Sequence, residues 1–233
     1  MKIRGASARI FFPFFFLFIF QLAGGVAPVS VSAATCLPFP RDGERIFHIV
    51  RFDQVLGEAR YRFSRDGENL IVRVDSAFAI GPATAPLYRF EHHSEEIWRD
   101  GRMRAVTSDT RENGERWRLR MDWDGQQLAG TLNGTSLAVS GLVVPTSLWH
   151  RDTPKSEVLF SVIDGLVRPI MVYQLGEREV SVDGRAHTAE GYILTGSFER
   201  KVWYDEECQL VGASFLGYDS REVTMELRSI EAP

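Results

Sequence analysis

The chain has 233 residues, and 27 Lys and Arg against 31 Asp and Glu give it a formal net charge of −4 at pH 7. A net-acidic chain is a poor candidate for binding nucleic acid, which requires a basic surface. Five scattered His and two distant Cys show none of the spacings typical of a metal site, so we expect no metal and no cofactor.

The first segment predicts export. Residues 1–9 carry three basic side chains and no acidic one, residues 10–20 are almost unbroken Phe, Leu and Ile, and small residues follow. This order is typical of a secretory signal peptide, and the apolar stretch is shorter than the roughly 20 residues that span a bilayer. We expect residues 1–34 to be removed and residues 35–233 to form a single soluble domain, periplasmic or secreted, of a Gram-negative bacterium. The alternative is an uncleaved anchor helix.

Two cysteines, Cys36 and Cys208, remain after that cleavage. An oxidising compartment allows them to form a disulfide. On the chain-entropy model, closing so long a loop contributes on the order of 4–5 kcal/mol to stability. The alternative is two separate thiols, one buried and one in the tail.

Turn signals recur along the whole chain. Asp-Gly or Asn-Gly pairs stand at 42–43, 66–67, 100–101, 113–114, 124–125, 133–134, 164–165 and 183–184. Such pairs favour tight hairpin turns, and between them apolar and polar residues alternate with the period of a half-buried strand. We predict an all-β fold of about a dozen strands: a large curved antiparallel meander, closed or half-open as a barrel. Two strand runs, about 45–140 and 157–229, should belong to one continuous sheet.

The break between the two runs contains Pro145, Thr146, Ser147 and Trp149. We predict one short helical turn near 145–152, capped by Thr146 or Ser147 and ended by Pro154. The same four residues form a candidate interaction loop.

Ser147, His150 and Asp152 have the residue types of a hydrolytic triad. Triads are normally gathered from separate parts of a chain, and no G-x-S-x-G nucleophile elbow is present. We therefore interpret this segment as a turn that crosses between the strand runs, and we predict no catalytic residue in it.

The strand over residues 87–98 places Tyr88, Phe90 and Trp98 on one face, which predicts that this face is the inner one. His92 and Glu96 share it, roughly 13 Å apart along the strand. Ionisable groups in an apolar interior need partners and acquire shifted pKa values. The functional interpretation is a polar spot in a ligand cavity, or an acid–base pair. The structural interpretation, which we prefer, is two buried polar groups satisfied by Arg or backbone partners.

Six arginines alternate with apolar residues and so share the opposite face: Arg60, Arg62, Arg73, Arg116, Arg118 and Arg120. We predict a solvated face with acidic partners on neighbouring strands. Contact with anionic lipid headgroups is the alternative.

Four segments carry a resemblance to a known family: Leu87 to His92, Glu96 to Gly101, Val144 to Trp149, and Val202 to Asp205. Together they resemble an exported bacterial family, domain of unknown function 6134, which is distantly similar to family 3108. The resemblance covers about residues 45 to 229. Where many members have a His after Pro-Thr-Ser, this chain has Leu148. The resemblance implies an exported β fold and assigns no activity and no functional residue.

Three functions are consistent with these features. The first is the binding or carriage of a lipid or other apolar ligand inside the curved sheet, with these candidate ligand-binding residues: Tyr88, Phe90, His92, Glu96, Trp98, Trp117 and Trp123. The second is a non-catalytic structural or protein-interaction module of the envelope, which binds through a free sheet edge or the crossover loop. The third is an enzyme that uses His92 and Glu96, which we favour least.

Overall fold

The computed structural model describes residues 40–41, 43–82, 84–182, 185–217 and 219–231. These residues form one 14-stranded sheet and one short 3-10 helix, rather than the predicted dozen strands. The signal segment and Cys36 lie outside the described residues, so cleavage and the disulfide stay predictions. Cys208 lies in a turn and not in a strand. No helix among the described residues has the length and apolar character needed to cross a membrane.

The first run is an antiparallel meander of eight strands: β1 (Gly43–Arg51), β2 (Gln54–Asp66), β3 (Asn69–Ile80), β4 (Tyr88–Arg99), β5 (Arg102–Glu112), β6 (Glu115–Trp123), β7 (Gln127–Leu132) and β8 (Thr135–Ser140). At the β5–β6 turn, Asn113 and Gly114 both have positive φ, as Asn133 and Gly134 do between β7 and β8. Two successive positive φ values define the hairpin turn that Asn-Gly favours, which confirms these predicted turns.

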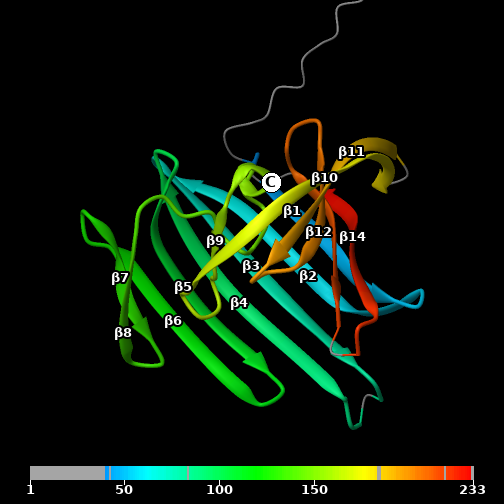
Figure 1. Cartoon of the computed structure of the whole chain (residues 1–233), viewed down its shortest axis with the longest axis horizontal. Coiled ribbons are helices and arrows are strands. Elements are labelled where there is room, and N and C mark those ends of the chain that lie inside the picture. Colours follow the sequence, from blue (N-terminus) through cyan, green and yellow to red (C-terminus); the bar gives the residue numbers. More distant parts are fainter. Residues whose placement is uncertain (1–39, 42, 83, 183–184, 218, 232–233) are drawn as a thin grey trace, which may run out of the picture. The chain divides into compact units, whose positions relative to one another are not determined.

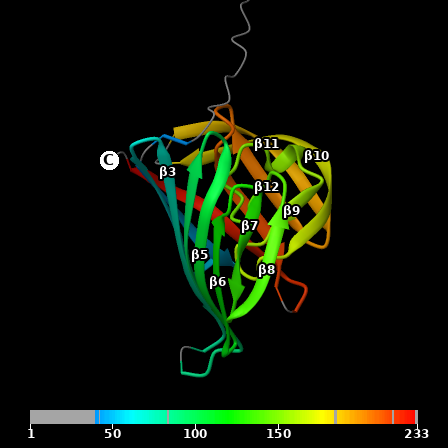
Figure 2. The ribbon, with the colours of Figure 1, turned by 90° about the vertical axis from the view of Figure 1, so that its left-hand side faces the viewer.

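The second run has six strands: β9 (Val158–Phe160), β10 (Val167–Val182), β11 (Arg185–Gly196), β12 (Arg200–Asp205), β13 (Leu210–Leu216) and β14 (Glu222–Glu231). The last strand, β14, pairs antiparallel with β1, so the two runs form one sheet, as predicted. The order begins with β8 and ends with β9, which means that the sheet curves without closing (Figure 1). Figure 2 shows the two walls of this curve, with β5 to β8 opposite β10 to β12.

The inner face of the sheet forms the apolar core. On β3, for example, Leu70, Val72 and Val74 are buried, and on β6 Leu119 and Met121 are buried. These residues stand at alternate positions, so the period of two predicted from the sequence is the period of burial. Removing their apolar area from water is the main favourable contribution to folding.

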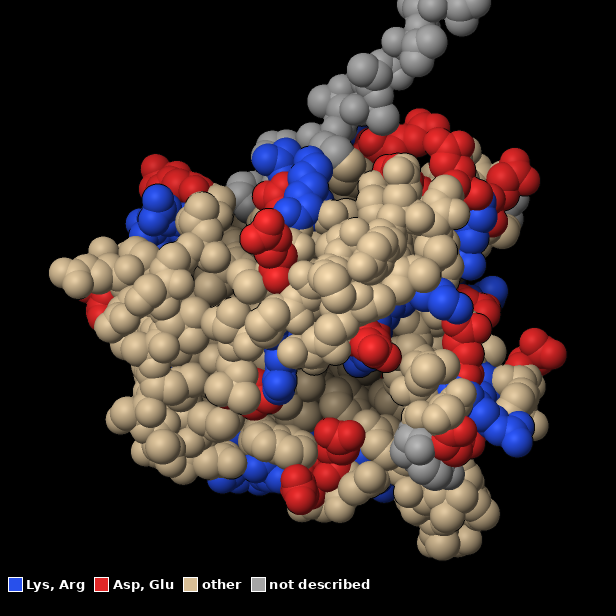
Figure 3. Space-filling model, in the orientation of Figure 1, with Lys and Arg blue, Asp and Glu red and all other residues tan. Residues whose placement is uncertain are grey.

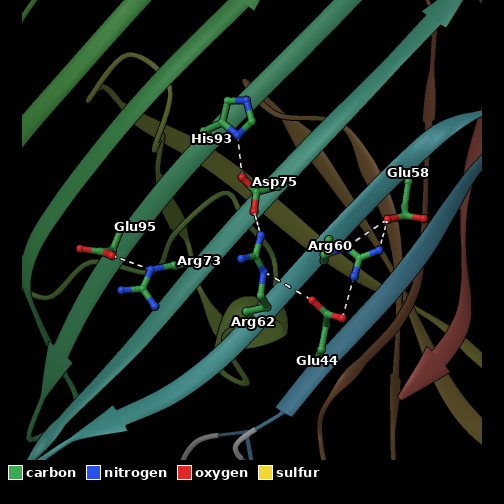
Figure 4. A network of polar contacts seen from close by, with 8 residues as sticks. All are labelled: Glu44, Glu58, Arg60, Arg62, Arg73, Asp75, His93 and Glu95. Carbon is green, nitrogen blue, oxygen red and sulfur yellow. Dashed lines mark hydrogen bonds and ion pairs between the residues drawn. The ribbon is translucent and has the colours of Figure 1, made fainter. Parts of the chain in front are cut away.

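The outer face is solvated, and basic and acidic side chains lie beside each other on it (Figure 4). Arg60 pairs with Glu44 at 2.8 Å, and Arg73 donates to Glu95 at 2.7 Å across the β3–β4 pair (Figure 4). The other four arginines also have acidic partners: Arg62 with Asp75, Arg116 and Arg118 with Asp109, and Arg120 with Asp122. The predicted cross-strand acidic partners are therefore present for five of the six arginines, whereas Arg120 pairs with Asp122 on its own strand.

The segment that joins β8 to β9, residues 141–157, crosses the inside of the curved sheet. Leu148 and Trp149 are 4% and 2% exposed. Tyr61 on β2 donates to the backbone carbonyl of Ser147 at 3.1 Å, and Tyr204 on β12 donates to that of Leu148 at 2.8 Å. The crossover is thus held by both walls of the sheet.

This burial corrects the prediction of an interaction loop at Pro145, Thr146, Ser147 and Trp149. Three of these residues are buried and Thr146 is half-buried. The apolar side chains of the loop fill the interior of the sheet instead of facing solvent.

The helical turn also differs from its prediction. It spans Thr153–Lys155, and neither Thr146 nor Ser147 caps it; its N-cap, Asp152, makes no side-chain capping bond. Pro154 stands in the first turn and does not end the helix. The fixed φ of proline suits the first position of a helix, where its missing N–H would have no partner anyway.

Glu96 anchors the crossover to β4. Its side chain is fully buried, and Ser147 Oγ donates to Oε1 at 2.7 Å. Trp98 Nε1 and Trp149 Nε1 both donate to Oε2, at 2.9 and 3.0 Å. Burial raises the pKa of Glu96, and the three donated bonds oppose that rise. Glu96 is satisfied, as the structural interpretation predicted, but its partners are Ser and Trp side chains and not the expected Arg or backbone groups.

We predict that Glu96→Leu lowers the free energy of unfolding by roughly 3–5 kcal/mol, because two buried indole N–H groups and one hydroxyl lose their acceptor. Glu96→Gln should cost less than about 1.5 kcal/mol, because its amide oxygen can accept from both indoles while its NH2 donates to Ser147. Urea unfolding measures both. Glu95→Leu, on the outer face of the same strand, is the control and should change stability by about 0.5 kcal/mol or less. Equal losses in the Gln and Leu variants would contradict this role.

Candidate functional site

A cavity of about 230 Å³ lies between the inner face of the sheet and the crossover. Its wall is mainly aliphatic and aromatic and includes Ile49, Val74, Phe78, Phe90, Phe198, Phe215 and Met225. A second depression of about 250 Å³ shares five residues with it, namely Phe78, Tyr88, Glu112, Arg200 and Phe215. The second depression also includes Leu216, which is 62% exposed, so it reaches the surface. Figure 3 shows this side of the molecule hollowed below β10.

Strand β4 supplies one aromatic side of the cavity. Tyr88, Phe90 and His92 stand at alternate positions of β4, so all three point inward. Phe78 on β3 is the cross-strand neighbour of Phe90, and their ring centroids lie 5.5 Å apart. The centroids of Phe78 and Tyr88 lie 5.6 Å apart. Tilted ring contacts at such distances are favourable, and they make this wall rigid.

His92 is buried in the same wall. Its Nδ1 lies 2.7 Å from Thr110 Oγ1 on β5, and its ring stacks against Phe90. Burial lowers the pKa of His92 to about 4, with a smaller contribution from His93. The imidazole is therefore neutral at neutral pH and supplies polarity to the cavity without charge.

Arg200 stands at the start of β12, on the inner face that it shares with Val202 and Tyr204. Its guanidinium carbon lies 4.5 Å from the ring centroid of Phe198 and 4.6 Å from that of Phe215. Its Nη1 donates to the backbone carbonyl of Glu199 at 2.7 Å. Within the described part of the chain, no carboxylate forms an ion pair with it. Burial lowers the pKa of Arg200 to about 10, so the group stays charged at neutral pH.

Tyr88 and Glu112 are, like Arg200, among the five residues that line both hollows. The Tyr88 hydroxyl donates to Glu112 Oε1 at 2.7 Å. Burial raises the pKa of Tyr88, the bond to Glu112 raises it further, and the charge of Arg200 acts in the opposite direction. Arg200 therefore lies near enough to the Tyr88 hydroxyl to influence it electrostatically.

The seven candidate ligand-binding residues fall into three environments. Tyr88, Phe90 and His92 line the cavity. Glu96 and Trp98 are fully buried against the crossover and do not line it. Trp117 and Trp123 are half-buried on β6 and also lie outside it. The crossover fills the part of the sheet where Glu96 and Trp98 were expected to meet a ligand.

Most residues of the cavity wall were not predicted, and they include Glu112, Phe198, Arg200 and Phe215. A signal existed for Arg200, because it alternates with Val202 and Tyr204, and this places it on the apolar face. The sequence shows no sign that strands β4 and β12 face each other.

The residue types of a triad do not come together as one. Ser147 Oγ donates to Glu96, and His150 Nδ1 accepts from the backbone N–H of Asp152 at 3.2 Å. No group of three or more His, Cys, Asp and Glu among the described residues is arranged to hold a metal ion.

Comparison with known proteins identifies a structure with a similar fold and a family. No curated protein matches the chain in sequence. Among solved structures it is similar to a beta-barrel-like protein of domain of unknown function DUF1849 from Brucella abortus, with 11% identity and a TM-score of 0.60, over 84% of this chain and 100% of that one. At this identity the likeness shows the fold alone. The family model described as domain of unknown function (DUF6134) matches residues 47–228. Because that match spans most of the sequence, the chain belongs to the DUF6134 family, as its four segments predicted.

Proposed function

We propose that this protein binds a small apolar molecule inside its curved sheet and acts as a carrier in the bacterial envelope. The observation that carries the proposal is the 230 Å³ cavity, which continues into the surface hollow of about 250 Å³. Protein interiors are normally packed to the density of organic crystals, and an apolar cavity of this size favours an apolar occupant over water.

The dimensions narrow the class of ligand. Sites for drug-sized molecules occupy roughly 300–1,000 Å³. The inner cavity, at about 230 Å³, lies below that range. A ring system or a short acyl chain suits this space better than a phospholipid with two long chains.

We expect the neutral fluorophore N-phenyl-1-naphthylamine to bind the protein with a stoichiometry of one and a rise in fluorescence. Ser76 lines the cavity on β3, so Ser76→Leu, which fills part of the space, should weaken binding at least about tenfold. Thr107→Leu places the same side chain on an exposed position of β5 and should leave the affinity unchanged. A titration of each purified protein measures this. No binding to the unaltered protein, or equal weakening in both variants, would overturn the proposal.

Export is part of the same proposal and is supported by the basic, apolar and small-residue order of residues 1–34. We expect the chain, expressed with its first segment in a Gram-negative host, to be recovered from the periplasm at the mass of a chain that begins near residue 35. Alkylation should detect the thiols of Cys36 and Cys208 only after reduction. Full-length protein in the cytoplasm would contradict export, and thiols that react without reduction would contradict the disulfide.

A free strand edge favours a second candidate function, that of a protein-interaction module. Among the described residues, β9 pairs with β10 only over Val167–Pro169. Beyond them Met171, Tyr173 and Leu175 expose apolar side chains at alternate positions, at 57%, 54% and 44%. Exposed edges of this kind accept a strand from another protein.

A photocrosslinking amino acid at Tyr173 tests this alternative in living cells. One discrete adduct at position 173, absent when the crosslinker stands at the exposed outer position Thr107, would support the interaction module. Identical patterns at the two positions would count against it.

A further inference from the structure

We propose that Arg200 makes the cavity selective for apolar ligands that carry one carboxylate. The carboxylate is held beside Arg200, where the two hollows share their lining, and the apolar body lies in the inner cavity. This inference rests on the proposed binding function and names the ligand class of the same site. The juxtaposition that carries it is a half-buried guanidinium that has no acidic partner among the described residues and lies where two hollows share their lining.

The position of Arg200 suits an anchor for a head group. It is one of the five residues shared by the inner cavity and the surface hollow. Inward from it the wall is apolar, with Val74, Phe90 and Met225. Outward from it the hollow includes the exposed Leu216. A ligand whose apolar body occupies the inner cavity can therefore place a carboxylate beside the guanidinium.

The bonding of Arg200 leaves capacity for such an anion. A guanidinium has five N–H donors, and one bond, to the carbonyl of Glu199, is present. Phe198 and Phe215 contact the guanidinium and hold it in place. A buried charge is costly without a counter-ion, and arginine binds a carboxylate through two parallel bonds. Attraction between opposite charges is also stronger inside a protein than in water.

The other titratable groups of the described cavity wall are Tyr61, Tyr88, His92 and Glu112. His92 is neutral at neutral pH because its pKa is lowered, and Tyr61 and Tyr88 are neutral because burial raises theirs. Glu112 is the one acidic residue of the described wall, and it accepts the bond from Tyr88. The negative charge of Glu112 would repel a ligand carboxylate held beside Arg200. Removing that charge should therefore strengthen the binding of an acid.

The test compares two ligands of the same shape, naphthalene-1-carboxylate and naphthalene-1-methanol, as competitors of N-phenyl-1-naphthylamine at pH 7.5. In the unaltered protein we expect the carboxylate to compete at a concentration at least about tenfold lower than the alcohol, which corresponds to 1.4 kcal/mol or more. Arg200→Gln should abolish this preference while the alcohol and the fluorophore bind within about threefold of their original affinities. Glu112→Gln should increase the preference.

Arg73→Gln is the matched control, because Arg73 pairs with Glu95 on the outer face and its loss should leave both ligands unaffected. Circular dichroism checks the fold of each variant. If Arg200→Gln does not fold, Arg200→Lys, which keeps the charge and loses the planar fork, should retain only part of the preference, and the Glu112→Gln result still decides.

The outcomes separate the two proposals. Failure of the fluorophore and both competitors to bind the unaltered protein overturns the binding function. Binding of the fluorophore and the alcohol, with no preference for the carboxylate or with a preference that survives Arg200→Gln, overturns the role of Arg200 and leaves the cavity as a site for neutral ligands.

Discussion

The buried carboxylate of Glu96 holds the interior of this protein together. One hydroxyl and two indole N–H groups donate to it, from β4 and from the crossover. Because a buried carboxylate without donors is strongly unfavourable, the crossover has one position in which these groups are all satisfied. That position places Trp149 against Trp98 with ring centroids 5.3 Å apart and fills one part of the curved sheet. The remaining part, beside Tyr88 and Phe90, stays open as the cavity.

Three ionisable side chains on the inner face, Glu96, His92 and Arg200, differ in how they are satisfied. Glu96 has three donors. His92 is neutral and contacts Thr110. Arg200 is charged, and its described polar contact is one backbone carbonyl. Since charges removed from water in proteins are normally paired, Arg200 is, of these three, the group that leaves bonds for a ligand to make. Glu96 therefore belongs to the part of the interior that maintains the fold, whereas Arg200 belongs to the part that we propose binds a ligand.

The ion pairs of the outer face have a different consequence. Each exposed pair contributes little to stability, so the arginine face does not hold the sheet together. It does fix which side of each strand faces water. Tyr61 and Arg62 are neighbours on β2, and a slip of one residue would bury Arg62 and expose Tyr61. The free-energy cost of such a slip maintains the register of the long strands. It thereby also fixes the inward direction of Tyr88, Phe90 and His92 on β4.

The sequence by itself determined the strand runs, several hairpin turns, the family, and the face on which Tyr88, Phe90, His92 and Glu96 lie, because turn chemistry and alternation are local properties of the chain. It could not distinguish Phe90 from Trp98, since both lie on the inner face of β4 and alternation does not reveal what packs against that face. Only the tertiary structure decided that the crossover covers Trp98, that Phe90 borders a cavity, and that Arg200 of β12 lies near Tyr88 of β4. These are contacts between residues far apart in the sequence, and they depend on how the whole sheet curves around its crossover.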